Sequence, residues 1–230
     1  EHSLAHNFVR TVFEDSKGHL LIGTYIGIQM YDPATDNFTP LAKLEDTGET
    51  LESNINSFIE RKNGEIWVSG NVLCKLDIKD HLLTVRKVDI AVTSPGSLFE
   101  DKKQNVWMAK GEEGVYQLTP DNQLTLHLSK DNGYVKSICE DQRGNIYVGS
   151  IRKGLFIYDK ERKTFVPIDL KEKGELPVCF LYSGIPNELY IGTDYFIFQN
   201  NNSDLRNLII SVRSGSKTKS VSSDHCTRMK

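Results

Sequence analysis

The stretch "CEDQRGNIYVGSIRKGLFIYD", residues 139–159, decides the fold because its layout recurs along the chain. It contains an acid pair, a turn glycine, alternating apolar residues, a Gly-Ser step and a second glycine. "FEDSKGHLLIGTYIGIQMYD" (13–32) has the same layout, and "IERKNGEIWVSGNVLCKLD" (59–77) and "FEDKKQNVWMAKGEEGVYQL" (99–118) are looser copies. "NELYIGTDYFIFQ" (187–199) keeps the second half. The recurrence indicates a structural unit built several times rather than a single site.

The spacing of the copies identifies the class of repeat. Each copy is anchored on the residue two positions before its small-residue step, and successive anchors are 46, 40, 40 and 43 residues apart. Such a period is typical of blade-type repeats. A fixed place in every copy predicts packing between sheets rather than ligand binding. The structural repeat positions are Leu21, Gly23, Trp67, Trp107, Tyr147, Gly149, Tyr190 and Gly192.

Within a copy the apolar residues alternate with a period of two, which predicts strands. In "EDQRG" the acid can bind backbone amides of a tight turn, and Gly144 can adopt a positive φ. Gln104 replaces this glycine in the third copy, at a small cost in stability. Four antiparallel strands per copy predict an all-β fold, a β-propeller of about five four-stranded blades. The expected blades within a propeller region at 1–210 are 6–52, 53–93, 94–132, 133–174 and 175–210.

The charge distribution separates a tail from the body of the chain. Residues 211–230 are serine-rich and hold five Lys or Arg against one acid, so we expect this tail to be disordered or non-native. The body is left with a net charge of −7, which argues against a nucleic-acid partner. No apolar run is long enough for a membrane helix, so no membrane contact is expected of this segment. We expect neither a cofactor nor a metal, because the four cysteines (Cys74, Cys139, Cys179 and Cys226) lack ligand spacing.

The meander determines which loops share a face of a propeller. The loop between the second and third strands of each copy lies on the same face as the connection between copies. Six extra residues between the first two anchors fit the longer connection at 40–53. Loop residues vary between copies while the framework does not, so they are better binding candidates, although each can also be an ordinary solvated residue. An aromatic face or a guanidinium suits a sugar ring or a uronate, and the candidates are Tyr25, Asn54, Asn71, Lys110, Tyr134, Arg152 and Tyr195.

Two of the copies resemble a known family. "VRTVFEDSKGHLLIGTYIGIQMYDPATDNF" (9–38) and "VKSICEDQRGNIYVGSIRKGLFIYDKERKTF" (135–165) are similar to the two-component regulator propeller repeats of hybrid two-component sensors in Bacteroides-type bacteria. The resemblance implies a periplasmic, usually seven-bladed propeller in an inner-membrane histidine kinase that senses glycan-derived oligosaccharides. No kinase motif is found in this sequence. We therefore expect a fragment of the sensory region whose partners are an oligosaccharide or other small ligand, further blades and domains of the parent protein, and a second copy in a homodimer.

Two alternatives to a binding module stay open. Propellers similar to streptogramin lyases use histidine with a metal at the central channel, and His127 lies near a connection between copies. It has no histidine close to it in sequence, so we expect no catalytic residues and no enzyme activity in this chain. The other alternative is a non-catalytic scaffold whose blades serve only to pack domains together.

Overall fold

A computed structural model of the chain describes residues 3–128, 133–168, 177–182, 189–193, 197–200, 210–214 and 217–221. The regular structure in these residues consists of strands alone, which confirms the all-β prediction. No helix capable of crossing a membrane occurs in them. The chain divides into two compact units, residues 1–106 and 107–230, which are described separately.

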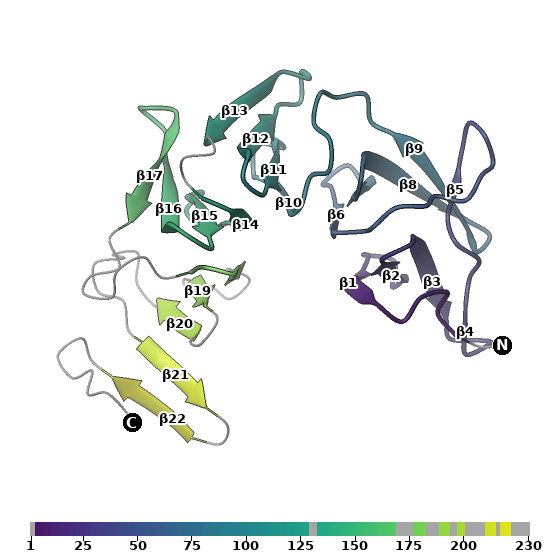
Figure 1. Ribbon diagram of the computed structural model, residues 1–230, viewed down its shortest axis with the longest axis horizontal. Helices are drawn as coiled ribbons and strands as arrows, with labels where there is room; N and C mark the ends of the chain where they lie inside the picture. Colours follow the sequence, from purple (N-terminus) through teal and green to yellow (C-terminus); the bar gives the residue numbers. More distant parts are fainter. Residues whose placement is uncertain are drawn as a thin grey trace. The chain divides into compact units, whose positions relative to one another are not determined.

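The first unit begins with an antiparallel meander, sheet 1, in the order β1-β2-β3-β4 (Figure 1). Its strands are β1 (Val9–Glu14), β2 (Leu20–Thr24), β3 (Ile28–Asp32) and β4 (Asn37–Phe38).

Sheet 2 repeats the meander and gains an additional edge strand. Its antiparallel strands are β6 (Ser57–Glu60), β7 (Ile66–Ser69), β8 (Leu73–Lys79) and β9 (Leu82–Lys87). The additional strand, β5 (Lys43–Leu44), pairs with β9 in parallel. The connection expected at 40–53 thus supplies a strand to sheet 2, although it lies in the range expected for the first blade.

Sheets 3 and 4 are four-stranded meanders, and the boundary between the units falls at the start of β11. Sheet 3 consists of β10 (Leu98–Glu100), β11 (Val106–Lys110), β12 (Gly114–Leu118) and β13 (Leu124–Leu128). Sheet 4 consists of β14 (Val135–Glu140), β15 (Ile146–Ser150), β16 (Gly154–Asp159) and β17 (Thr164–Ile168).

The fifth copy has three strands in the described part of the chain. Sheet 5 is formed by β18 (Phe180–Tyr182), β19 (Leu189–Gly192) and β20 (Ile197–Asn200). A separate hairpin of β21 (Ile210–Ser214) and β22 (Lys217–Val221) follows in the tail, where the sequence predicts no regular structure. The repeated meanders are those of a β-propeller, as predicted. A seven-bladed parent ring stays a prediction.

In three of the turns between a first and a second strand, an aspartate binds the turn's own backbone. Asp141 Oδ1 accepts hydrogen bonds from the N–H groups two and four residues further on, at 2.9 and 2.8 Å. Asp15 and Asp101 accept the same pair of bonds. The position three residues after the aspartate has a positive φ, 78° at Gly144 and 66° at Gln104. The predicted turn chemistry is therefore present, and Gln104 adopts the conformation that glycine favours.

In the second and third copies, the glutamate before the turn binds the turn of the preceding sheet. Glu60, at the end of β6, accepts hydrogen bonds from the N–H and the hydroxyl of Ser16, at 2.7 and 2.6 Å. Glu100, at the end of β10, accepts from the N–H of Lys62 at 2.7 Å and from Nε of Arg61 at 2.8 Å. The two acids of a pair thus have different roles. The aspartate holds its own turn, and the glutamate joins neighbouring sheets.

The small-residue step is required by the close approach of the next sheet. A Cβ atom on Gly23 would lie 2.6 Å from a methyl group of Ile55, and one on Gly149 would lie 2.5 Å from a methyl group of Val178. Large apolar side chains fill the remaining space between sheets. Leu21, Ile28, Phe58, Val68 and Val85 belong to the core between sheets 1 and 2. Cys139, Tyr147, Leu155, Val178 and Ile191 belong to the core between sheets 4 and 5.

Candidate functional site

The structure brings three predicted candidates together in the second unit. Lys110 is the last residue of β11, Tyr134 precedes β14, and Arg152 lies in the loop between β15 and β16. Backbone bonds hold these segments side by side, because Val135 N–H donates to the Gly111 carbonyl at 2.8 Å and Ile151 N–H donates to the Tyr134 carbonyl at 2.9 Å. With two glutamates, these residues form the loop cluster: Lys110, Glu112, Glu113, Tyr134 and Arg152.

The loop cluster presents an exposed aromatic ring among charged groups. Tyr134 is 43% exposed. An ion pair of 3.1 Å joins Arg152 Nη1 to Glu112 Oε1, and one of 2.7 Å joins Lys110 Nζ to Glu113 Oε1. The Arg152–Glu112 pair is largely exposed, so it contributes little stability and can be exchanged for bonds to a ligand. A ring, a guanidinium and carboxylates together can stack on a sugar and hydrogen-bond its hydroxyl groups.

A hollow of about 760 Å³ in the first unit lies beside the 40–53 connection. Leu44, Leu51 and Val72 contribute apolar surface to it. Two lysines and two glutamates also line it, and no ion pair joins them within the described residues. We call this site the connection hollow, and its charged lining residues are Lys43, Lys87, Glu49 and Glu52.

The predicted candidates of the first unit lie in two groups. Asn71 lines the connection hollow, and its N–H donates to Ser53 Oγ at 3.0 Å. Asn54 follows this serine, and its buried Oδ1 has no hydrogen-bond partner. No described hydrogen bond, ion pair or ring contact joins Tyr25 to either asparagine.

Tyr25 instead belongs to an aromatic group at the chain's first strand. Its ring stacks on His6 and meets Phe8 edge to face, with both pairs of ring centroids 6.0 Å apart. The last candidate, Tyr195, lies outside the described residues. The expected single cluster is therefore observed for Lys110, Tyr134 and Arg152, and Tyr25 stands apart from the asparagines of its own unit.

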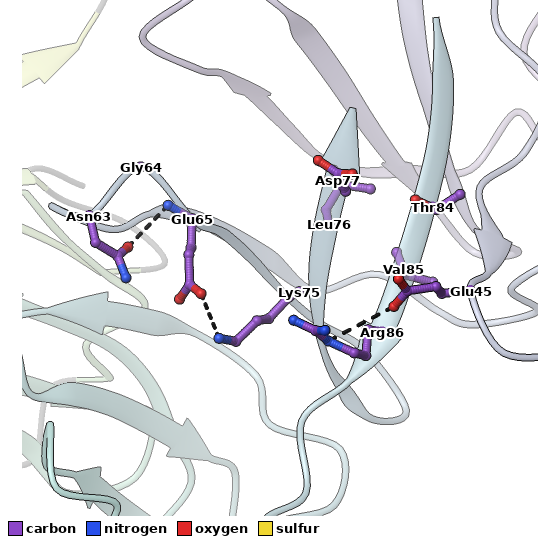
Figure 2. A pocket seen from close by; sticks show the side chains of 10 residues that line it. All are labelled: Glu45, Asn63, Gly64, Glu65, Lys75, Leu76, Asp77, Thr84, Val85 and Arg86. Atoms are coloured by element: carbon purple, nitrogen blue, oxygen red, sulfur yellow. Dashed lines mark hydrogen bonds and ion pairs between the residues drawn. The ribbon is translucent and has the colours of Figure 1, made fainter. Parts of the chain in front are cut away.

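A second hollow, of about 380 Å³, lies on sheet 2, and Figure 2 shows the residues that line it. Its charged groups are largely paired with one another. Glu65 Oε1 accepts a hydrogen bond from Lys75 Nζ at 2.6 Å, and Arg86 Nε lies 3.9 Å from Glu45 Oε2 (Figure 2). Because these charges already have partners, the connection hollow is the better binding candidate of the two.

Glu65, which is paired with Lys75 in Figure 2, belongs to a charge-reversed turn. Arg61 stands where Asp15, Asp101 and Asp141 stand in the corresponding turns, and its Nη1 lies 3.6 Å from Glu65 Oε2. Partial burial acts to raise the pKa of Glu65, but hydrogen bonds from Lys75, Trp67 and Asn63 outweigh it and lower the pKa to about 2. The arrangement stabilises the turn and the buried Trp67, so its charges have a structural role.

The buried Cys74 and the half-buried His127 have structural surroundings. Burial raises the pKa of the Cys74 thiol to about 11, which keeps it protonated and unreactive. His127 lies 2.7 Å from Gln117 Oε1 through Nε2 and 3.1 Å from the Lys163 carbonyl through Nδ1. Burial lowers the pKa of His127, so the ring is neutral at pH 7. No group of metal-binding side chains occurs among the residues that the structure describes.

Two segments of the chain match the model of a known family. Residues 3–25 and 129–152 match the family model described as two component regulator propeller. These two segments of the chain are similar to two-component regulator propeller repeats. The second matched segment includes Tyr134 and ends at Arg152, so two members of the loop cluster lie within it. A comparison with curated proteins found no match.

Solved structures share the propeller fold at low sequence identity. The extracellular domain of a protein assigned to the hybrid two component systems of B. thetaiotaomicron is 18% identical, with a TM-score of 0.69 over 87% of this chain and 29% of that chain. Virginiamycin B lyase from Staphylococcus aureus is 12% identical, with a TM-score of 0.65 over 86% of this chain and 68% of that one. PorZ, a surface component of the type-IX secretion system of Porphyromonas gingivalis, is 16% identical, with a TM-score of 0.63 over 85% of this chain and 32% of that chain. The chain thus spans less than a third of the B. thetaiotaomicron structure.

The sequence analysis missed the two glutamates that form ion pairs with the candidate residues Lys110 and Arg152. Glu112 and Glu113 form the ion pairs of the loop cluster, and the adjacent acids in "KGEEG" (110–114) were the available signal. The lining of the connection hollow was also missed. The available signal for this hollow was the distance of 46 residues between the first two anchors, which shows that the connection at 40–53 is longer than the others.

Proposed function

We propose that this chain belongs to the extracytoplasmic, periplasmic sensory propeller of a hybrid two-component signalling protein. The observation that carries the proposal is the match of two segments, residues 3–25 and 129–152, to the two component regulator propeller model. The shared fold with the extracellular domain from B. thetaiotaomicron supports it.

The ligand of this sensor is an oligosaccharide held at the loop cluster. Tyr134 offers an exposed ring for stacking, and Arg152 offers a guanidinium that can bind a uronate carboxylate through two parallel hydrogen bonds. The ligand changes the balance between arrangements of domains or subunits, and no covalent step takes place in this chain.

Calorimetric titration of the purified chain with neutral and uronate-containing oligosaccharides tests the proposal. We expect a uronate-containing oligosaccharide to bind, and Tyr134→Ala or Arg152→Ala to weaken binding about tenfold, which corresponds to about 1.4 kcal/mol. Arg162→Ala is the matched control, because Arg162 is an equally exposed arginine in the turn between β16 and β17. Wild-type affinity in both loop-cluster variants, or no binding by any oligosaccharide, would contradict the assignment of the site.

A lyase is the second candidate, because the virginiamycin B lyase structure shares the fold. We favour binding because both ring nitrogens of His127 are engaged by Gln117 and Lys163. Incubating the chain with quinupristin distinguishes the two candidates. Linear product that is absent with a His127→Gln variant would establish the lyase instead.

A further inference from the structure

The ring of Tyr134 lies against the backbone of Gly111. A Cβ atom on Gly111 would lie 3.0 Å from Cε2 and 3.2 Å from Cζ of that ring, closer than ordinary van der Waals contact. The two segments are joined beside this contact, because Val135 N–H donates to the Gly111 carbonyl at 2.8 Å. The ring therefore lies where any other residue at position 111 would have its side chain.

A glycine at this position is particular to the third repeat. The residue four positions after the anchor is Tyr25 in the first repeat, Asn71 in the second and Ile151 in the fourth. The framework of the repeat therefore accepts a side chain there. Gly111 has a φ of 45°, in the left-handed region that glycine adopts without strain. This glycine thus serves the loop that carries it and the ring beside it, and not the framework that the repeats share.

A second glycine, Gly133, contacts the segment that carries Arg152. A Cβ atom on Gly133 would lie 2.9 Å from Ser150 Oγ and 3.0 Å from Arg152 Cβ. Because Arg152 Cβ is attached directly to the backbone, a side chain at position 133 would displace the loop between β15 and β16. Tyr134 follows Gly133, and its carbonyl accepts a hydrogen bond from Ile151 N–H at 2.9 Å. One short segment therefore sets the places of the ring and of the base of the arginine side chain.

We propose that Gly111 and Gly133 are positioning residues of the loop cluster, which hold the Tyr134 ring and the base of the Arg152 side chain at the spacing that a uronate-containing oligosaccharide requires. The inference rests on the function proposed above for the loop cluster. A sugar that stacks on Tyr134 can receive two parallel hydrogen bonds from Arg152 only at a suitable spacing of the two groups. Groups that are held in the bound arrangement beforehand lose less entropy on binding.

Calorimetric titration with a uronate-containing oligosaccharide tests the effect on binding. Gly111→Ala and Gly133→Ala should each weaken binding about fivefold, which corresponds to about 1 kcal/mol. Gly144→Ala is the matched control, because its φ of 78° is close to the 76° of Gly133 and the nearest atom to an added Cβ lies at 3.5 Å. It introduces the same backbone strain at the opposite end of β14 and β15, and it should bind like the wild type. In a Tyr134→Ala background, Gly111→Ala should cause no further loss of affinity.

NMR spectra of the chain without ligand test the positions of the two groups directly. With fluorotyrosine incorporated, the fluorine signal of Tyr134, assigned by its loss in Tyr134→Phe, should shift in Gly111→Ala and stay in place in Gly144→Ala. The Nε–H signal of Arg152, assigned by its loss in Arg152→Ala, should likewise shift in Gly133→Ala. Circular dichroism verifies folding. Gly111→Asn provides a second variant, because asparagine tolerates a positive φ better than alanine.

The two measurements distinguish failure of the proposed ligand from failure of the positioning role. If the wild type binds no oligosaccharide but both signals shift as expected, the assigned ligand is wrong and the positioning by the two glycines is supported. Unmoved signals in the folded glycine variants, wild-type affinity in both variants, or an equal loss of affinity in Gly144→Ala would each overturn the positioning role.

Discussion

In the turns of the first, third and fourth copies, the aspartate is the residue on which the local geometry depends most directly. Asp141 binds the turn's N–H groups with Oδ1 and the Asn145 side-chain amide with Oδ2 at 2.9 Å. Asp101 and Asn105 form the same pair at 2.8 Å. Charge-assisted bonds of this kind keep the turn closed even where its third position lacks glycine, as at Gln104.

Gln104→Gly should stabilise the chain by about 1 kcal/mol, because a side chain in the left-handed region is strained by roughly that amount. The φ of 66° at Gln104 places it in this region. Urea unfolding measures the effect. Gly64→Gln is the reciprocal control, because Gly64 has a φ of 82° and open space around it, and it should lose a similar amount. A loss of stability in Gln104→Gly would show that the side chain makes a compensating contact.

At the scale of elements, the neighbouring sheets are joined by apolar packing and by the glutamate bonds. Gly23 admits Ile55 to close contact, and Glu60 binds Ser16 at the edge of the same interface. Gly23 and Ile55 are 32 positions apart and Ser16 and Glu60 are 44 apart, so both connections join neighbouring repeats. The sheets of a unit therefore stabilise one another through recurring contacts.

Glu60→Ala should destabilise the first unit by about 1 kcal/mol, because two hydrogen bonds to a carboxylate are lost at an exposed site. Thermal unfolding in dilute solution measures this loss. Glu14→Ala is the matched control, since the equivalent glutamate has no partner in the described residues, and its effect should stay within about 0.5 kcal/mol. Equal effects of the two substitutions would contradict the assigned role of Glu60.

The strands that could be predicted from the sequence are those with clear alternation and a recurring turn. β14 and β15 are examples, because their period of two and the "EDQRG" turn are explicit in the sequence. β5 could not be found in this way, because a strand of two residues shows no alternation and depends on the exposed edge of β9. The loop cluster was predicted in part, since topology places the loops together but side-chain conformations decide which charges pair.

At the scale of the whole molecule, the hydrogen bonds from a glutamate to the turn of the preceding sheet affect which insertions and deletions in the gene the fold can tolerate. The second repeat contributes one acceptor, Glu60, to the turn before it and one turn, at Lys62, to the acceptor after it. Duplication or deletion of one whole repeat leaves every acceptor matched with a turn. A break inside a repeat leaves two partners unmatched. Unequal recombination in whole periods can therefore lengthen or shorten the array without a new interface having to evolve.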